Sequence, residues 1–146
     1  MDHEWFSNQL GSSQQGWDWF SIQLDNHTEL MLFQLRRIDG SIDPYSAGTY
    51  IARDGRATHL KHGDFELEPA AYWTSPKTGA RYPVEWRIRV PALKLALECV
   101  PAMPEQELVS DDAEAPTYWE GAVTYSGSAS GAGYLEMTGY SKPMRF

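Results

Sequence analysis

The first residues of the chain carry side chains suited to acid–base chemistry. Asp2, His3, Glu4 and Trp5 follow one another directly. In an extended segment, Asp2 and Glu4 share one face, and the other two side chains share the opposite face. A carboxyl pair that faces an apolar cavity is expected to keep one proton, because burial and like-charge repulsion both raise a carboxyl pKa. Such a group is a proton donor, although a solvated N-terminus accounts for the same residues equally well.

A second candidate group is the sequence Gly-Trp-Asp-Trp-Phe at residues 16–20. In a strand, Trp17 and Trp19 lie on one face, whereas Asp18 and Phe20 lie on the other. A carboxyl group is costly to bury without a partner, but two indoles are not. We therefore expect the indoles to face the interior, where aromatic rings can stabilise a cationic intermediate.

Residues 118–120 raise the same question on another predicted strand. Tyr118 and Glu120 share one face, and Trp119 lies on the other. A buried Glu120 would be a further candidate acid. Packing alone explains Trp119 equally well, so both interpretations stay open.

Metal and serine-hydrolase chemistry are not indicated. His27, His59 and His62 lie in or near predicted turns, and no His-x-His or His-Glu-x-x-His spacing exists. The serines of the glycine-rich segment 126–133 lack a Gly-x-Ser-x-Gly motif between a strand and a helix. We therefore expect neither a metal site nor a cofactor.

Short strands separated by turns are expected to position the candidate groups. The clearest strand covers residues 84–90, where Val84, Trp86, Ile88 and Val90 alternate with charged residues at period two. The alternation continues after residue 91 as far as Cys99, which predicts a buried thiol. Further strands are predicted at residues 17–24, 29–38, 47–52, 64–68, 117–125 and 134–140, with no convincing helix.

These eight or nine strands predict an all-β fold. Closing an antiparallel sheet on itself removes its exposed edges, so we predict an up-and-down, lipocalin-like (calycin) barrel, with an open sandwich as the alternative. Residues 126–133 are predicted as a flexible hairpin loop. Residues 101–116 contain three prolines and an acidic run and are predicted as a long solvated loop. A lid over a barrel mouth is the less favoured interpretation of that second loop.

The composition limits the classes of function. The chain has 146 residues, 42% of them hydrophobic, which suits one domain over residues 1–146. Twenty acidic and twelve basic residues give a net charge of −8, which disfavours nucleic acid and anionic lipid as partners. No window approaches the roughly 18 consecutive apolar residues of a transmembrane helix. Aromatic residues make up 13% of the chain and suit a ligand cavity, although packing a small core is the simpler explanation.

A series of motifs runs along nearly the whole chain. They read Asp-His-Glu-Trp at 2–5, Gly-Trp-Asp-Trp-Phe at 16–20, Trp-Thr-Ser-Pro at 73–76, Gly-Ala-Arg-Tyr-Pro at 79–83, Tyr-Trp-Glu-Gly at 118–121 and Gly-Tyr-Leu-Glu-Met-Thr-Gly-Tyr at 133–140. In this order they resemble the carotenoid 1,2-hydratase (hydroxyneurosporene synthase) and AttH-like family. The resemblance implies a lipocalin-like domain, the C-terminal one of two, with an N-terminal sister domain as its partner. Relatives are often exported to the periplasm or beyond, but the compartment of this chain is left open.

The resemblance also implies a reaction, the hydration of an isoprenoid end group without a cofactor. An acid protonates the terminal alkene, a tertiary carbocation forms, and water captures it. By analogy with the family motif, Asp2 is the first choice for the acid, with Glu4 and Glu120 as alternates, and His3 would orient or reprotonate it. The apolar wall and the cation-stabilising rings would come from Trp5, Trp17, Trp19, Tyr118 and Trp119.

Two other functions compete with the hydratase. In the first, the barrel binds a hydrophobic small molecule without turning it over. In the second, its own rings fill the interior, and the functional surface is an interface with the sister domain or with a second copy in a homodimer.

Overall fold

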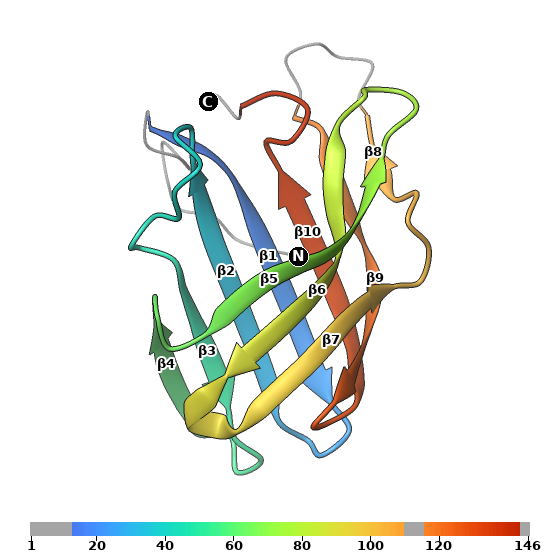
Figure 1. Cartoon of the computed structure of the whole chain (residues 1–146). Coiled ribbons are helices and arrows are strands. Elements are labelled where there is room, and N and C mark those ends of the chain that lie inside the picture. Colours follow the sequence, from blue (N-terminus) through green and yellow to red (C-terminus); the bar gives the residue numbers. More distant parts are fainter. Residues whose placement is uncertain (1–12, 110–115, 144–146) are drawn as a thin grey trace.

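The computed structural model describes residues 13–109 and 116–143, which form one strongly curved antiparallel sheet (Figure 1). Its strands are β1 (Gln14–Leu24), β2 (Glu29–Arg37), β3 (Ala47–Ile51), β4 (Ala57–Lys61), β5 (Glu66–Thr74), β6 (Arg81–Val90), β7 (Leu95–Pro101), β8 (Glu107–Leu108), β9 (Tyr118–Gly127) and β10 (Gly131–Thr138). One 3-10 turn, η1 (Pro91–Leu93), joins β6 to β7. None of the helical structure in the described residues is long and apolar enough to cross a membrane.

The strand order is that of an up-and-down barrel. It runs β4-β3-β2-β1-β10-β9-β7-β6-β5, with the short β8 paired to β9. The first and last long strands of the chain pair in the middle of the sheet. β4 and β5, which are consecutive in the chain, form its two edges in the part that the structure describes. The all-β, lipocalin-like prediction is thus confirmed, as a half-barrel with a seam between β4 and β5.

Alternation along the strands determines which side chains enter the barrel. Val84, Trp86, Ile88 and Val90 are each at most 4% exposed, as their spacing predicts. Cys99 is fully buried, which is also confirmed, and burial raises the pKa of its thiol to about 12. The core is one continuous cluster of the inward side chains.

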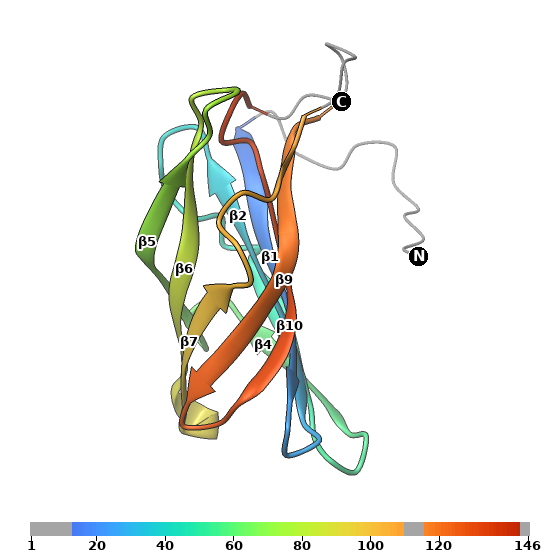
Figure 2. The ribbon, with the colours of Figure 1, turned by 90° about the vertical axis from the view of Figure 1, so that its right-hand side faces the viewer.

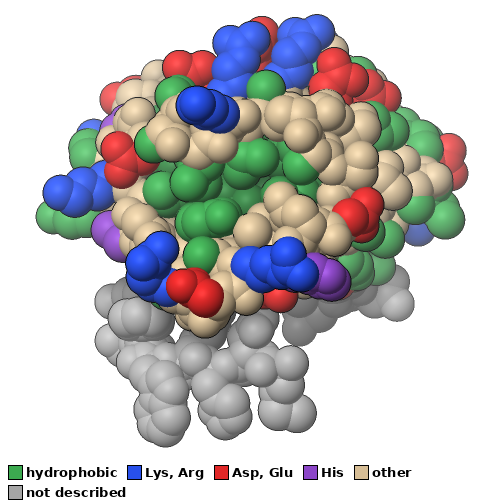
Figure 3. Space-filling view, turned by 90° about the horizontal axis from the view of Figure 1, so that it is seen from below, with side chains coloured by type: hydrophobic (Ala, Val, Ile, Leu, Met, Phe, Trp, Pro, Cys, Tyr) green, Lys and Arg blue, Asp and Glu red, His purple; other side chains and the backbone are tan. Residues whose placement is uncertain are grey.

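The lower end of the barrel is apolar. The turn η1 lies at this end in Figure 1, where Leu93 and Leu95 pack against the core. Seen from below, apolar side chains gather at the centre within a rim of polar and charged ones (Figure 3). The buried charged side chain inside the barrel, Asp18, lies toward the opposite, upper end, where β1 begins and β10 ends.

The glycine-rich segment is shorter as a loop than predicted. β9 continues to Gly127 and β10 begins at Gly131, so the turn between them covers only residues 128–130. Two of its glycines serve strand packing: a Cβ on Gly131 or Gly133 would meet the backbone of β1. These glycines allow β10 to approach β1 closely, and they do not form the predicted flexible loop.

The predicted solvated loop after β7 is wrong in part, because residues 107–108 form β8, although most of residues 102–108 are exposed as expected. Residues 102–108 lie against the barrel, β8 pairs with β9, and the Trp119 indole N–H donates to the Pro104 carbonyl at 2.7 Å. Figure 2 shows this segment running upward between β6 and β9. The docked segment is therefore part of the barrel wall. Residues 110–115 lie outside the described part.

The close approach at Gly133 leads to a stability prediction. In Gly133→Ala, the new methyl group would press on the Ser21 carbonyl of β1 and lie 3.0 Å from the Tyr125 ring. We expect a loss of about 1–3 kcal/mol in the free energy of unfolding, measured by urea denaturation. The neighbouring, exposed Ala132→Ser should stay within about 0.5 kcal/mol of wild type. Equal stabilities of the two variants would contradict this account.

Candidate functional site

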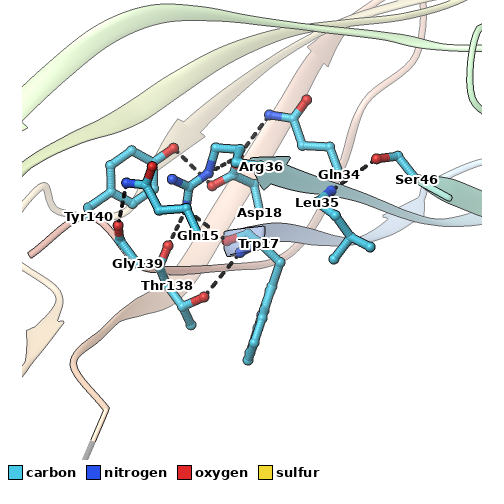
Figure 4. A network of polar contacts seen from close by, with 10 residues as sticks. All are labelled: Gln15, Trp17, Asp18, Gln34, Leu35, Arg36, Ser46, Thr138, Gly139 and Tyr140. Atoms are coloured by element: carbon cyan, nitrogen blue, oxygen red, sulfur yellow. Dashed lines mark hydrogen bonds and ion pairs between the residues drawn. The ribbon is translucent and has the colours of Figure 1, made fainter. Parts of the chain in front are cut away.

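A fully buried carboxyl group lies at the upper end of the barrel. Asp18 of β1 has no exposed surface. Its Oδ2 accepts hydrogen bonds from Gln34 Nε2 at 2.7 Å and from Arg36 Nε at 3.1 Å, and its Oδ1 accepts one from the Tyr140 hydroxyl at 2.9 Å. Figure 4 shows these four side chains converging from β1, β2 and the end of β10. The carboxyl group is buried with donors on both oxygens.

The sheet register brings the four residues together. Asp18 lies opposite Gln34 on β2, and Arg36 follows two positions later, so both enter the barrel from the same face of β2. β10 flanks β1 on the side away from β2, and Tyr140 follows two residues after the end of β10. Between the end of β10 and Tyr140, Gly139 has a positive φ of 74°, and the chain turns there over the end of the barrel.

Arg36 makes several contacts besides the one to Asp18. Its guanidinium donates to the carbonyl of Thr138 and, at 3.5 Å, to that of Trp17. The same group lies 3.8 Å from the centre of the Tyr140 ring, a cation–π contact. Arg36 therefore links β1, β2 and the turn after β10.

The predicted inner face of β1 is wrong. Asp18 and Phe20 are fully buried inside the barrel, whereas Trp17 and Trp19 lie half-buried on the outside. The prediction failed because it treated the carboxyl group as unpartnered. Neighbouring strands supply Arg36 and two further donors, which offset the cost of burial.

Burial dominates the acidity of this group. It raises the pKa of the Asp18 carboxyl above the ordinary 3.8, and Arg36, Gln34 and Tyr140 oppose the rise. Burial and the nearby carboxylate likewise raise the pKa of Tyr140. Asp18 therefore keeps a proton to a higher pH than a solvated aspartate does, while Tyr140 remains a neutral hydrogen-bond donor.

A second polar cluster adjoins the first through an aromatic contact. The Tyr82 ring lies 5.2 Å from that of Tyr140, and the Tyr82 hydroxyl donates to Glu107 Oε1 at 2.9 Å. Glu107 accepts two more hydrogen bonds, one from Thr78 Oγ1 at 2.6 Å and one from Ser75 Oγ. A cavity of about 130 Å³ beside Glu107 is lined by Trp73, Ser75, Pro76, Lys77, Glu105 and Glu107.

The structure separates the residues that the sequence suggested for the site. Trp119 is inside the barrel and fully buried. Tyr118 and Glu120 are half-buried on the outside, where the Tyr118 ring lies 6.5 Å from that of Trp17. Glu120 is therefore not the interior acid considered above, and it pairs in register with Glu136 of β10. The ligand-binding roles of Trp17, Trp19, Tyr118 and Trp119 stay predictions.

The motif residues Asp2, His3, Glu4 and Trp5 lie outside the described residues, so their roles also remain predictions. The residues that sequence reasoning missed are Gln34, Arg36, Tyr82, Glu107 and Tyr140. A signal for two of them was available, because Gln34 and Arg36 continue the inward alternation of Leu30 and Leu32 on the strand next to Asp18. Tyr140 ends the motif at residues 133–140 and Glu107 belongs to the acidic run of the predicted loop, but neither position indicated an inward side chain.

One buried donor in the core has no partner. Phe20 and Trp86 pack edge to face, with ring centres 5.4 Å apart. Among the buried side-chain nitrogen and oxygen atoms of the described residues, only Trp86 Nε1 lacks a hydrogen-bond partner. Buried polar groups rarely lack a hydrogen-bond partner, and this N–H could donate to a bound water or to a ligand oxygen. Within residues 13–109 and 116–143, no group of three His, Cys, Asp or Glu side chains could hold a metal ion.

Comparison with known proteins assigns the chain to a family. The family model described as AttH-like matches residues 1–140. The chain belongs to the AttH-like family. No match to a curated protein was found.

Two solved structures resemble this member of the AttH-like family. A crystal structure of an AttH candidate from Nitrosomonas europaea is 34% identical, with a TM-score of 0.82 over 90% of this chain. Kievitone hydratase from Nectria haematococca has a TM-score of 0.70 over 88% of this chain, and at 20% identity it shows the fold alone. The chain spans 40% of the length of each of these two chains.

Asp18 and a second buried aspartate should respond to pH in opposite ways. Asp43 is 3% exposed and pairs with Arg37 at 3.1 Å, and the backbone N–H of Tyr45, then Gln14 and Arg37, lower its pKa. Its stabilising contribution is present above pH 3.8 and is lost as the pH falls through its lowered pKa. Asp18 has a raised pKa, so its contribution is complete below 3.8 and is lost as the pH rises through that pKa.

Urea unfolding of Asp18→Asn and Asp43→Asn from pH 3 to pH 8 would measure the two effects. Each unit of pKa difference between the folded and unfolded states corresponds to about 1.4 kcal/mol. We expect D18N to remove the decline in stability above pH 4, and D43N to remove part of the acid-side decline. If the stability of D18N falls above pH 4 in parallel with that of the wild type, a group other than Asp18 causes the decline.

Proposed function

We propose that this domain adds water to a carbon–carbon double bond of a hydrophobic, isoprenoid-like substrate, with Asp18 as the acid. The observation that carries the proposal is the fully buried Asp18 carboxyl group, whose pKa burial raises. Burial favours the protonated form of a carboxyl group, and a protonated carboxyl group can donate its proton. The proposal extends the carotenoid 1,2-hydratase resemblance of the sequence to a substrate class.

The reaction balances without a cofactor. The Asp18 proton forms a new C–H bond at the end of the alkene, and the positive charge develops on the adjacent tertiary carbon. Water adds to that carbon and returns a proton to the carboxylate, so that the net change is the addition of water. Arg36 and Tyr140, both bonded to Asp18, would stabilise the carboxylate between these steps.

Aromatic rings and an indole N–H supply the other requirements. Tyr82 lies beside Tyr140 at the end where Asp18 is buried, and aromatic ring faces can stabilise a cation, as the Tyr140 ring does for the Arg36 guanidinium. The unpartnered Trp86 N–H would hold the water or a substrate oxygen. From the N-terminal motif, Asp2 with Glu4 as its alternate remains a competing acid, and His3 a group that orients or reprotonates it.

Family membership supports a hydratase-like domain, and the substrate and the domain arrangement are part of the proposal. The chain spans 40% of the length of each matched structure, which supports placing it beside a sister domain, and its place as the C-terminal one rests on the resemblance of the sequence alone. The fold is shared with a kievitone hydratase. Addition of water to a hydrophobic compound is the reaction that these features favour together.

Isotope labelling tests the reaction directly. The chain is incubated with an acyclic carotenoid in ¹⁸O water, and the product is followed by mass. We expect Asp18→Asn to slow incorporation by about 100-fold or more, the usual contribution of a general acid. Asp43→Asn removes a similar arginine-paired carboxylate and should leave the rate unchanged. Loss of turnover in Asp2→Asn but not in Asp18→Asn would transfer the role to Asp2.

A non-catalytic role is the second candidate, favoured by the outer face of the sheet. Trp17, Trp19 and Tyr118 lie half-buried there, and the interior is largely filled by its own side chains. Such a domain would bind a hydrophobic small molecule, or pack against a sister domain or a second copy. Titration of tryptophan fluorescence with retinoids, carotenoids and fatty acids would support the binder if quenching saturates without any change in ligand mass.

A further inference from the structure

Besides the two edge strands, the segment after β7 is also tied by its backbone to a single neighbour in the part of the chain that the structure describes. Between β7 and β9 the chain forms a segment, residues 102–108, that we call the strap. It occupies the gap between the upper halves of β6 and β9 (Figure 2). On the β9 side, Ala102 N–H donates to Ala122 O at 2.9 Å, and Glu120 N–H donates to Gln106 O at 3.1 Å. With the β8–β9 pairing, these bonds attach the strap to β9 along its length.

The opposite margin of the strap lacks such a ladder. β6 pairs with β7 only from Trp86 onward, and in its upper half Pro83 has no N–H to donate. No backbone pairing between the strap and β6 exists in the described residues. The small cavity beside Glu107 lies between this margin and the turn that joins β5 to β6. The wall is thus discontinuous at this place.

One side chain bridges that margin. Glu107 of the strap accepts hydrogen bonds from Ser75 and Thr78 of the β5–β6 turn and from Tyr82 of β6. Hydrogen bonds to an ionised carboxylate are stronger than those between neutral groups. In the part of the chain that the structure describes, the hydrogen bonds between the strap and β5–β6 all end on this carboxylate.

The strap covers the barrel at the level of the proposed acid. Trp119, whose indole donates to Pro104 of the strap, pairs in register with Met137 on β10. Met137 in turn pairs with Asp18 on β1. On the other side, Tyr82 lies under Glu107 and contacts Tyr140, the hydrogen-bond donor to Asp18.

We propose that the strap is a gate in the barrel wall, hinged on β9 and latched by Glu107, that opens the interior at the level of Asp18. Three hydroxyl groups on one carboxylate form a latch that a single side-chain change can release, while the ladder to β9 keeps the strap attached. The inference that the opening admits a substrate rests on the proposed function. The inference that the wall opens is independent of that function.

Hydroxyl-radical footprinting of the whole chain, read by mass spectrometry, tests the latch without a ligand. Glu107→Ala should raise labelling of Tyr82, which is fully buried, by about tenfold, as expected when bonds to a charged group are lost. Tyr125 is 2% exposed and lies in the lower half of the barrel, so its labelling should not change. Glu105→Ala is the matched control, because the hydroxyls of Ser75, Thr78 and Tyr82 bond Glu107 and not Glu105. Tyr82 labelling equal in E107A, E105A and wild type would overturn the gate.

A second variant covers the case in which E107A unfolds and labels Tyr125 as well. Thr78→Val removes one hydroxyl from the exposed side of the latch. A smaller rise at Tyr82 alone then supports the gate, and no rise contradicts it. For the role in access, E107A should speed the association of all-trans-retinol, followed by tryptophan quenching. Opening without any change in that rate would overturn the access role and leave the proposed hydration untouched.

Discussion

The upper end of this barrel depends on the contact between the buried Asp18 carboxyl group and Arg36. A carboxyl group with no exposed surface is costly to bury unless donors satisfy its oxygens, and here every donor comes from outside β1. Gln34 and Arg36 come from β2, and Tyr140 comes from the turn after β10. The pair therefore sets the face of β1 that enters the barrel and the position of the chain after β10.

This constraint divides the barrel into two parts with different chemistry. Below the Phe20–Trp86 contact, the interior is mostly apolar, and Leu93 and Leu95 pack against the core near η1. Above it, charged and hydroxyl groups surround Asp18 and Glu107, and the two clusters meet where Tyr82 contacts Tyr140. A lipocalin-like barrel that only packs its own core has no need for such an end. The chain belongs to the AttH-like family, and burial raises the pKa of the Asp18 carboxyl group at this polar end.

Much of the architecture could be predicted because alternation is a local property. The strand at Val84 to Val90 and the burial of Cys99 follow from period two, and the run after Glu29 is a strand as expected. The two loop predictions failed for opposite reasons. Small glycine residues suggested a loop where close strand packing requires them, and prolines with acidic residues suggested solvent where Glu107 is held by three hydroxyls.

Sequence alone determined that Trp17 and Trp19 share one face of a strand and that Asp18 lies on the other, because side chains alternate along any extended chain. Only the tertiary structure decided which face is inside. The free energy of burying a carboxyl group depends on donors that neighbouring strands bring to it, and Tyr140 lies 122 positions away in the chain. The same holds for Glu107, whose three partners come from the turn after β5 and from β6. Local spacing orders side chains, but the register between strands selects their partners.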